Sequence, residues 1–173
     1  MNDAWRRENP WAITLAEARD TRLVACPPIE PGKLNQLKVW TVTHLRPVAA
    51  RGIDVEALVH MTGRAGAERT LRCGDRDGAQ FVRRDGLSCH FLINLLETPT
   101  GLQLLSYAFH VDAPGSTPAF LRWEYAVSRK AGVDAVKEPL AHLHPGHDDV
   151  RLPAPVLGPR EIIAVFLGLE RWG

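Results

Sequence analysis

The chain lacks paired cysteines, long apolar runs and a net charge, and each absence excludes a class of protein. Its three cysteines, Cys26, Cys73 and Cys89, form no CxxC pair, which excludes a zinc ribbon or a thioredoxin-like site of the usual spacing. An odd number of cysteines without a disulfide pattern favours a reducing compartment, so we expect a cytoplasmic protein. The polar segment 1–8 predicts no signal peptide. No stretch approaches the ~20 apolar residues of a membrane span, so we expect no membrane contact.

The charges nearly cancel, and the composition is that of an ordinary globular protein. The formal net charge is +1, which excludes the overall basic field typical of many nucleic-acid-binding proteins. Arginines gather locally between residues 64 and 84, where they would suit either phosphate contact or a solvated hairpin rim. The 173 residues are 45% hydrophobic and show no repeat. We therefore expect a single domain, residues 1–173, with a sizeable core.

Residues 1–66 predict mainly helical or irregular structure. A capping box at Thr14–Glu17 predicts a helix from Leu15 to about Val24. Residues 34–45 are ambiguous, because helical spacing at their start gives way to a β-rich run at 39–43. Asp54 can cap a short helix that begins at Val55.

Residues 67–157 predict an antiparallel meander of about five strands joined by tight turns. The Asp77-Gly78 pair predicts a hairpin between the first two strand segments. Pro159 suits the first position of a closing helix over residues 158–171. The predicted class is α+β, a sheet covered by N- and C-terminal helices. The strand segments are 67–73, 79–84, 88–97, 102–112, 120–127 and 140–144.

Three of the seven histidines lie close together near the C-terminus, followed at once by two aspartates. If residues 140–144 form a strand, His142 and His144 share a face. Pro145-Gly146 would then turn the chain and bring His147, Asp148 or Asp149 back to that side. Two same-face histidines and a returning ligand are typical of a Zn²⁺ or Mn²⁺ site. The predicted ligands are therefore His142, His144 and His147.

The same cluster suits two other interpretations. Without a metal, His142 and His144 would act as general base and general acid in RNA cleavage, with Arg122 neutralising the phosphorane. His147 and Asp148 would then support the site. Alternatively, a segment rich in His, Pro, Gly and Asp is simply an exposed loop. The sequence leaves open whether the site binds a metal.

Other polar residues alternate along the neighbouring predicted strands. His90 shares a face with Asn94, and His110 shares a face with Ser106. If those faces meet, a polar patch would cross the sheet beside Arg122 and Glu124. His110 and Glu124 are therefore candidate supporting residues of the site.

About 50 residues of the C-terminal third resemble the small bacterial TumE-type toxins of toxin–antitoxin modules. The resemblance rests on Arg122-Trp123-Glu124, on His142-Leu143-His144 and on a closing helix over 159–169. In that family an Arg-Tyr-Asp strand is usual, so Trp123 and Glu124 depart from the pattern. The resemblance implies a growth-control or defence setting, with RNA as a possible substrate and an antitoxin as a possible partner.

Three functions follow as expectations. The first is a toxin-like protein that cleaves RNA, as a ribonuclease or a metal-dependent hydrolase. The second is a non-catalytic interaction module or a subunit of a larger assembly. The third is a small-ligand-binding sheet with a pocket lined by His90, His110 and Arg122.

Overall fold

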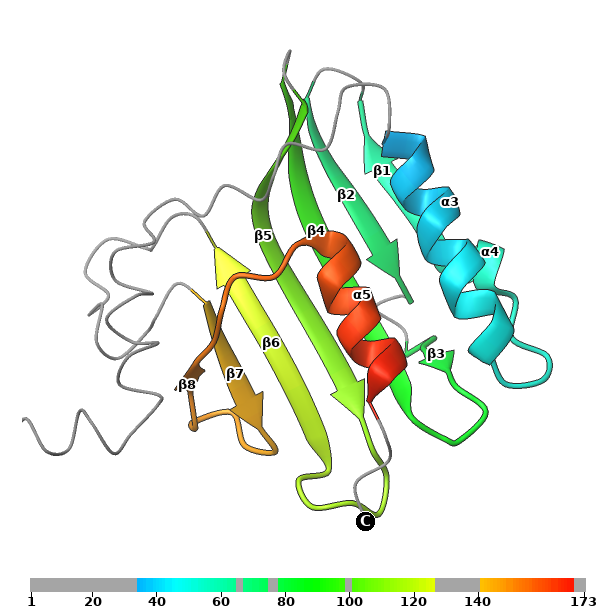
Figure 1. Cartoon of the computed structure of the whole chain (residues 1–173), viewed down its shortest axis with the longest axis vertical. Coiled ribbons are helices and arrows are strands. Elements are labelled where there is room, and N and C mark those ends of the chain that lie inside the picture. Colours follow the sequence, from blue (N-terminus) through cyan, green and yellow to red (C-terminus); the bar gives the residue numbers. More distant parts are fainter. Residues whose placement is uncertain (1–33, 65–66, 75–77, 99–100, 127–140, 170–173) are drawn as a thin grey trace, which may run out of the picture.

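The computed structural model contains one antiparallel sheet with its two longer helices on the same face (Figure 1). It describes residues 34–64, 67–74, 78–98, 101–126 and 141–169, so the helix predicted at 15–24 lies outside the described residues. The α+β class is confirmed, although the sheet has eight strands rather than about five. The strand order is β1-β2-β4-β5-β6-β7-β8, with β3 paired to β4.

The bounds of the elements follow the predicted segments closely in the second half of the chain. The helices are α3 (Leu34–Leu45), the 3₁₀ turn η1 (Arg46–Val48), α4 (Val55–Leu58) and α5 (Pro159–Gly168). The strands are β1 (Val59–Gly63), β2 (Glu68–Cys73), β3 (Phe81–Val82), β4 (Ser88–Thr98), β5 (Gly101–Asp112), β6 (Phe120–Ala126), β7 (Ala141–Pro145) and β8 (Leu152–Pro153).

The ambiguous segment 34–45 is a helix because its apolar residues pack on the sheet at helical spacing. Leu37 and Leu45 are almost completely buried, and the Thr41 hydroxyl donates a hydrogen bond to the Leu37 carbonyl at 2.8 Å. Burial of this face overrides the β-propensity of residues 39–43. Asp54 caps α4 as predicted, since its carboxylate accepts hydrogen bonds from the amides of Glu56 and Ala57.

The hairpin predicted at Asp77-Gly78 is wrong. Strands β2 and β3 do not pair with each other, because both pair with the same side of the long apolar strand β4. β2 and β3 lie one after the other along the same edge of β4, and the strand is interrupted between Cys73 and Phe81. A side chain at Gly74 would meet the Ala79 carbonyl oxygen at 2.4 Å, and its φ of +84° also requires glycine. Long-range pairing with β4 outweighs the local turn signal.

The sequence also misses two strands. β1 lies within the segment 1–66 that predicts mainly helical or irregular structure, so the sheet begins at Val59. β8 is only two residues long and pairs with β7 at the opposite edge. Short edge strands carry too few residues for a period-2 pattern to be visible.

The core lies between the helices and one face of the sheet. The Phe166 ring of α5 is fully buried and meets the rings of Phe81 and Phe109 at centroid distances of 5.8 and 6.1 Å. Arg83 is also buried, and its guanidinium donates to the carbonyl oxygens of Phe166, at 2.7 Å, and Leu167. The cation therefore caps the C-terminal end of α5, where the last carbonyls lack helical partners.

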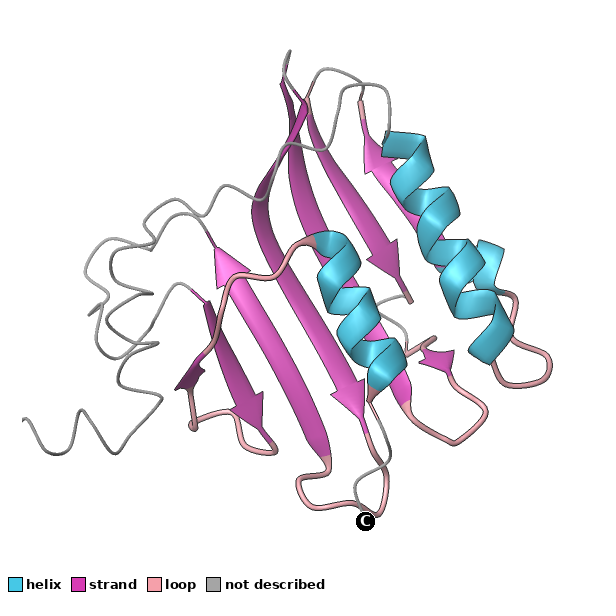
Figure 2. Ribbon diagram, in the orientation of Figure 1, coloured by secondary structure: helices cyan, strands magenta, loops and turns pink. Residues whose placement is uncertain are grey.

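The opposite face of the sheet carries the predicted site. Both α3 and α5 lie on one side of the sheet (Figure 2), and side chains alternate along each strand. Phe91, Phe109 and Trp123 belong to the core or pack against it, so residues 90, 110 and 122 project from the other side. We call this second side the open face.

Candidate functional site

The pairing register aligns four candidate residues in one row across four neighbouring strands. His90 of β4 pairs with His110 of β5, His110 pairs with Arg122 of β6, and Arg122 pairs with His144 of β7. In the next row, Glu124 pairs with His142. Neighbouring strands lie about 4.8 Å apart, so side chains along such a row are in contact range. The polar patch that the sequence predicts beside Arg122 and Glu124 is therefore present.

Glu124 lies at the centre of the histidine cluster. Its Oε2 atom is 3.2 Å from Nε2 of His142 and 3.4 Å from Nε2 of His144. One ligand atom from each of these three residues lies within 4.8 Å of the other two. The hydrogen bond with His142 and the charge of Arg122 lower the pKa of Glu124 to about 2. The carboxylate is therefore ionised throughout the physiological range.

His144 is completely buried and its ring is without normal hydrogen bonds. Its exposed fraction is 0%, and neither Nδ1 nor Nε2 makes a hydrogen bond of normal geometry. Burial and the neighbouring Arg122 guanidinium lower the pKa of His144, and Glu124 and the Asp148 backbone offset them only in part. The ring is therefore neutral at pH 7, with one nitrogen lone pair available. Neutral imidazole is the form that binds metals.

Arg122 contacts the carboxylate oxygen of Glu124 that does not face the histidines. Its Nε atom lies 3.0 Å from Oε1 of Glu124, and its Nη1 atom lies 2.8 Å from Oδ1 of Asp148. Arg122 therefore engages one carboxylate oxygen of Glu124 while the other faces the imidazoles. Such outer partners orient metal ligands in known sites.

The connection after β7 returns to the open face as predicted, but it brings Asp148 rather than His147. Gly146 makes the turn with a φ of +73°, and a side chain there would meet Cβ of Pro118 at 2.6 Å. His147 faces outward, with 66% of its side chain exposed and its Nδ1 atom 3.7 Å from the Asp149 carboxylate. The structure therefore groups His142 and His144 with Glu124, and it does not bring the predicted third ligand His147 to them.

A cavity of about 420 Å³ opens on the same face beside this cluster. His90, His110 and Arg122 line it, as the ligand-binding interpretation predicts, and Arg72 lines it as well. The two imidazoles are stacked, with centroids 4.8 Å apart and planes 14° from parallel. The Nε2 atom of His110 lies 3.0 Å from Oδ1 of Asp112, which fixes the orientation of the ring.

Sequence analysis misses Asp112, and it does not assign Arg72 to this cavity. Asp112 has a visible signal, because it follows His110 by two positions on a strand and shares its face. Arg72 belongs to the arginine-rich segment 64–84, which suits phosphate contact, but its place beside β4 depends on a strand order that the predicted hairpin would not produce.

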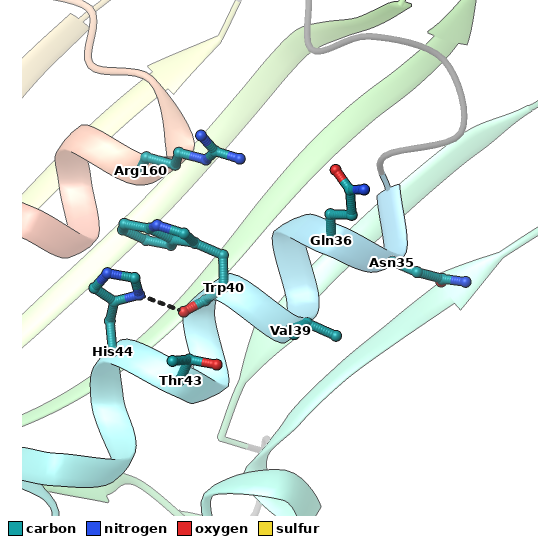
Figure 3. Close-up of a pocket in the computed structure, with 7 residues that line it drawn as sticks. All are labelled: Asn35, Gln36, Val39, Trp40, Thr43, His44 and Arg160. Carbon is teal, nitrogen blue, oxygen red and sulfur yellow. Dashed lines mark hydrogen bonds between the residues drawn. The ribbon is translucent and has the colours of Figure 1, made fainter.

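A second cavity, of about 410 Å³, lies on the helical layer. Figure 3 shows the Trp40 ring of α3 between the His44 imidazole and the Arg160 guanidinium of α5. The two rings are stacked at 4.0 Å, and the guanidinium lies 5.6 Å from the Trp40 ring. Among the described residues that line this cavity, none carries a carboxylate or a thiol. The described cluster that combines histidines with a carboxylate lies instead on the open face.

Comparison of the chain with models of protein families, with curated proteins and with solved structures finds no match. None of the helices in the described part of the chain has the length and apolar character that a membrane span requires. The structure therefore defines an α+β protein with a carboxylate–histidine cluster and an adjoining cavity on the open face of its sheet. Two imidazoles and one carboxylate are a ligand set found in catalytic zinc sites, in which a water takes the fourth position.

Proposed function

We propose that this protein is a metal-dependent hydrolase of phosphodiester bonds in RNA. In this proposal Glu124, His142 and His144 hold one Zn²⁺ or Mn²⁺ ion on the open face. The observation that carries it is the buried His144 ring, whose nitrogens lack normal hydrogen bonds although Nε2 is 3.4 Å from a carboxylate oxygen. A buried polar group without a partner costs about 1–3 kcal/mol. A bound cation would offset that cost.

Two of the three ligand-to-ligand distances fit a tetrahedral ion, and the third is within 4.8 Å. Ligands at 2.0–2.1 Å from a tetrahedral metal are about 3.3 Å from one another. The Glu124 carboxylate oxygen lies 3.2 Å from His142 Nε2 and 3.4 Å from His144 Nε2. Three protein ligands leave one position for water.

A metal ion there would lower the pKa of its bound water. In the hydrolysis that this would support, the water oxygen would form a bond to phosphorus, one P–O bond to ribose would break, and the proton lost by the water would pass to the departing oxygen. With neutral imidazoles, a divalent cation would leave the cluster of Arg122, Glu124 and Asp148 with net positive charge. Positive charge beside a cavity attracts a phosphodiester.

The burial of His144 argues against the metal-free alternative. A general acid or base must come within hydrogen-bond reach of the atom it protonates or deprotonates. The exposed fraction of His144 is 0%, so an acid–base pair of His142 and His144 would need a rearrangement that brings the substrate to this ring. The choice of RNA, and of a growth-control setting, is supported by the resemblance of residues 120–169 to TumE-type toxins.

Metal analysis of the purified protein tests this proposal. After chelation and reloading with Zn²⁺ or Mn²⁺, we expect about one ion per chain for the wild type and a large loss for Glu124→Gln and His144→Ala. His147→Ala is the matched control and should retain the ion. Hydrolysis of bis(p-nitrophenyl) phosphate and of a fluorescent oligoribonucleotide would follow the metal content.

Three results would contradict the proposal. The first is a wild type that binds no ion at micromolar concentrations, and the second is a His144→Ala variant that binds as well as the wild type. The third is full ribonuclease activity in the presence of chelator, which would favour the acid–base pair. An inactive protein that copurifies with a stoichiometric partner would favour the interaction module.

A further inference from the structure

We propose that the cavity bounded by Arg72, His90, His110 and Arg122 is a second phosphate subsite. It would bind a phosphate that neighbours the scissile one, so that the RNA strand crosses the sheet from β7 toward β2. The identity of the ligand as RNA rests on the proposed function. The cavity and its charges are properties of the described fold alone.

The register explains why a hollow forms at this place. Along one row Arg72 pairs with Leu92, Leu92 with Ala108, and Ala108 with Glu124. The small, exposed side chain of Ala108 is the low point of that row. A space therefore opens between the arginine of β2 and the cluster on β6 and β7. Its volume of about 420 Å³ lies within the usual range of ligand-binding cavities.

The polar lining of the cavity suits an anion. Two guanidinium groups and two imidazoles face it, and among the described lining residues none carries a carboxylate. Guanidinium forks match phosphate oxygens in geometry as well as in charge. The nearby carboxylates of Asp112, Glu124 and Asp148 contact His110 and Arg122 from outside this lining.

His90 supplies a donor or acceptor that the protein leaves unused. Its Nδ1 atom is buried without a hydrogen-bond partner, and its ring stacks on that of His110. Burial and the neighbouring His110 imidazole lower the pKa of His90. A bound anion would act in the opposite direction on this pKa.

A polar network farther along the same strands provides the contrast. There the Thr70 hydroxyl donates to Asn94, and the Asn94 amide donates to Ser106, each at 2.8 Å. These three side chains satisfy one another across β2, β4 and β5. In the row that contains His90, some buried side-chain nitrogens have no hydrogen-bond partner. This part of the open face can therefore form further hydrogen bonds with a ligand.

Arg122 connects the two subsites. It lines the cavity and also contacts Glu124, the central residue of the proposed metal site. A substrate with one phosphate at the metal and the next in the cavity would therefore contact Arg122 from both sides. This arrangement predicts that the protein prefers substrates with more than one phosphodiester.

Direct binding tests the subsite without requiring catalysis. Fluorescence anisotropy with a labelled oligoribonucleotide, and calorimetry with inorganic phosphate, would compare the wild type with Arg72→Gln and His90→Gln. We expect each variant to weaken both ligands about tenfold, as the loss of a charge-assisted contact does. Arg160→Gln, on the helical layer, is the matched control and should bind like the wild type. Circular dichroism verifies that each variant folds.

Turnover provides the second measurement. The ratio of kcat/KM for a trinucleotide to that for a dinucleotide should exceed one in the wild type and fall in Arg72→Gln. Variants that bind oligonucleotide and phosphate as tightly as the wild type would overturn the subsite. If the protein binds no metal but phosphate binding still depends on Arg72, the hydrolase proposal fails while the anion site stands.

Discussion

The Nε2 atom of His144 lies 3.4 Å from Oε2 of Glu124. Both nitrogens of the His144 ring are buried without normal hydrogen bonds. The two residues are on adjacent strands, and the pairing of Arg122 with His144 fixes their approach. Burying an imidazole without partners opposes folding. Local sacrifices of stability of this kind are typical of functional sites.

Replacing this imidazole with an apolar side chain should therefore stabilise the metal-free protein. We expect His144→Leu to raise the free energy of unfolding by about 1–2 kcal/mol, because it removes a desolvated polar group from a packed position. It should also abolish metal binding. Urea denaturation in the presence of chelator measures the change. His147→Leu, on the exposed connection, should stay within about 0.5 kcal/mol of the wild type. A destabilised His144→Leu would show that the contacts of the ring with Glu124 and the Asp148 backbone outweigh the cost of burying it.

Zn²⁺ should stabilise the folded wild type. Because the ligands come from two strands that are adjacent only in the folded sheet, the ion binds the native state preferentially. At one hundred times its dissociation constant it would add about 2.7 kcal/mol to the free energy of unfolding. Thermal unfolding with and without the ion measures this shift. Glu124→Gln should lose it, whereas Asp149→Asn should keep it. An equal shift in Glu124→Gln would place the ion elsewhere.

The contact between Arg83 and Asp85 predicts a loss of stability in acid. The Arg83 hydrogen bond holds the pKa of the Asp85 carboxyl below its usual range. A carboxyl whose pKa is depressed in the folded state stabilises the protein at neutral pH, and that stabilisation is lost as the pH falls below about 4. Asp85→Asn should therefore be less stable than the wild type at pH 7, and the difference should shrink toward pH 2. Denaturant unfolding across that range measures it. A constant difference would show that the pair makes no ionic contribution.

Arg83 itself should be more important than its ion pair, because its guanidinium also caps α5. Replacing it with methionine leaves the Phe166 and Leu167 carbonyls without their donor. We expect a loss of about 3 kcal/mol, the usual cost of removing one partner of a buried charged contact. In the same unfolding series, Arg84→Met should cost far less, since its side chain is exposed.

If the growth-control setting is right, induced expression in a bacterial host should slow growth. The Glu124→Gln variant should not, because it lacks the central ligand of the proposed site. Growth curves at matched protein levels, with His147→Ala as the control, measure the difference. If the wild type and Glu124→Gln inhibited growth equally, the inhibition would not depend on this site.

Much of the second half of the fold could be predicted from the sequence. The strands 88–97, 102–112 and 120–127 and the helix start at Pro159 have long, clear patterns, and the structure confirms them. The hairpin at Asp77-Gly78 fails for the opposite reason, because a two-residue signal competes with the pairing of two strands to β4. Residues 34–45 are ambiguous in sequence because burial on the sheet, and not propensity, makes them helical.

The sequence by itself determines which side chains share a face of a strand, because alternation depends only on near neighbours. It therefore places His142 with His144, and Arg122 with Glu124. The tertiary structure alone decides which of these faces meet, because register is set by the contacts summed along whole strands. Only through that register does Glu124, rather than His147, join the two imidazoles, and only through the strand order does Arg72 reach the same cavity as His90.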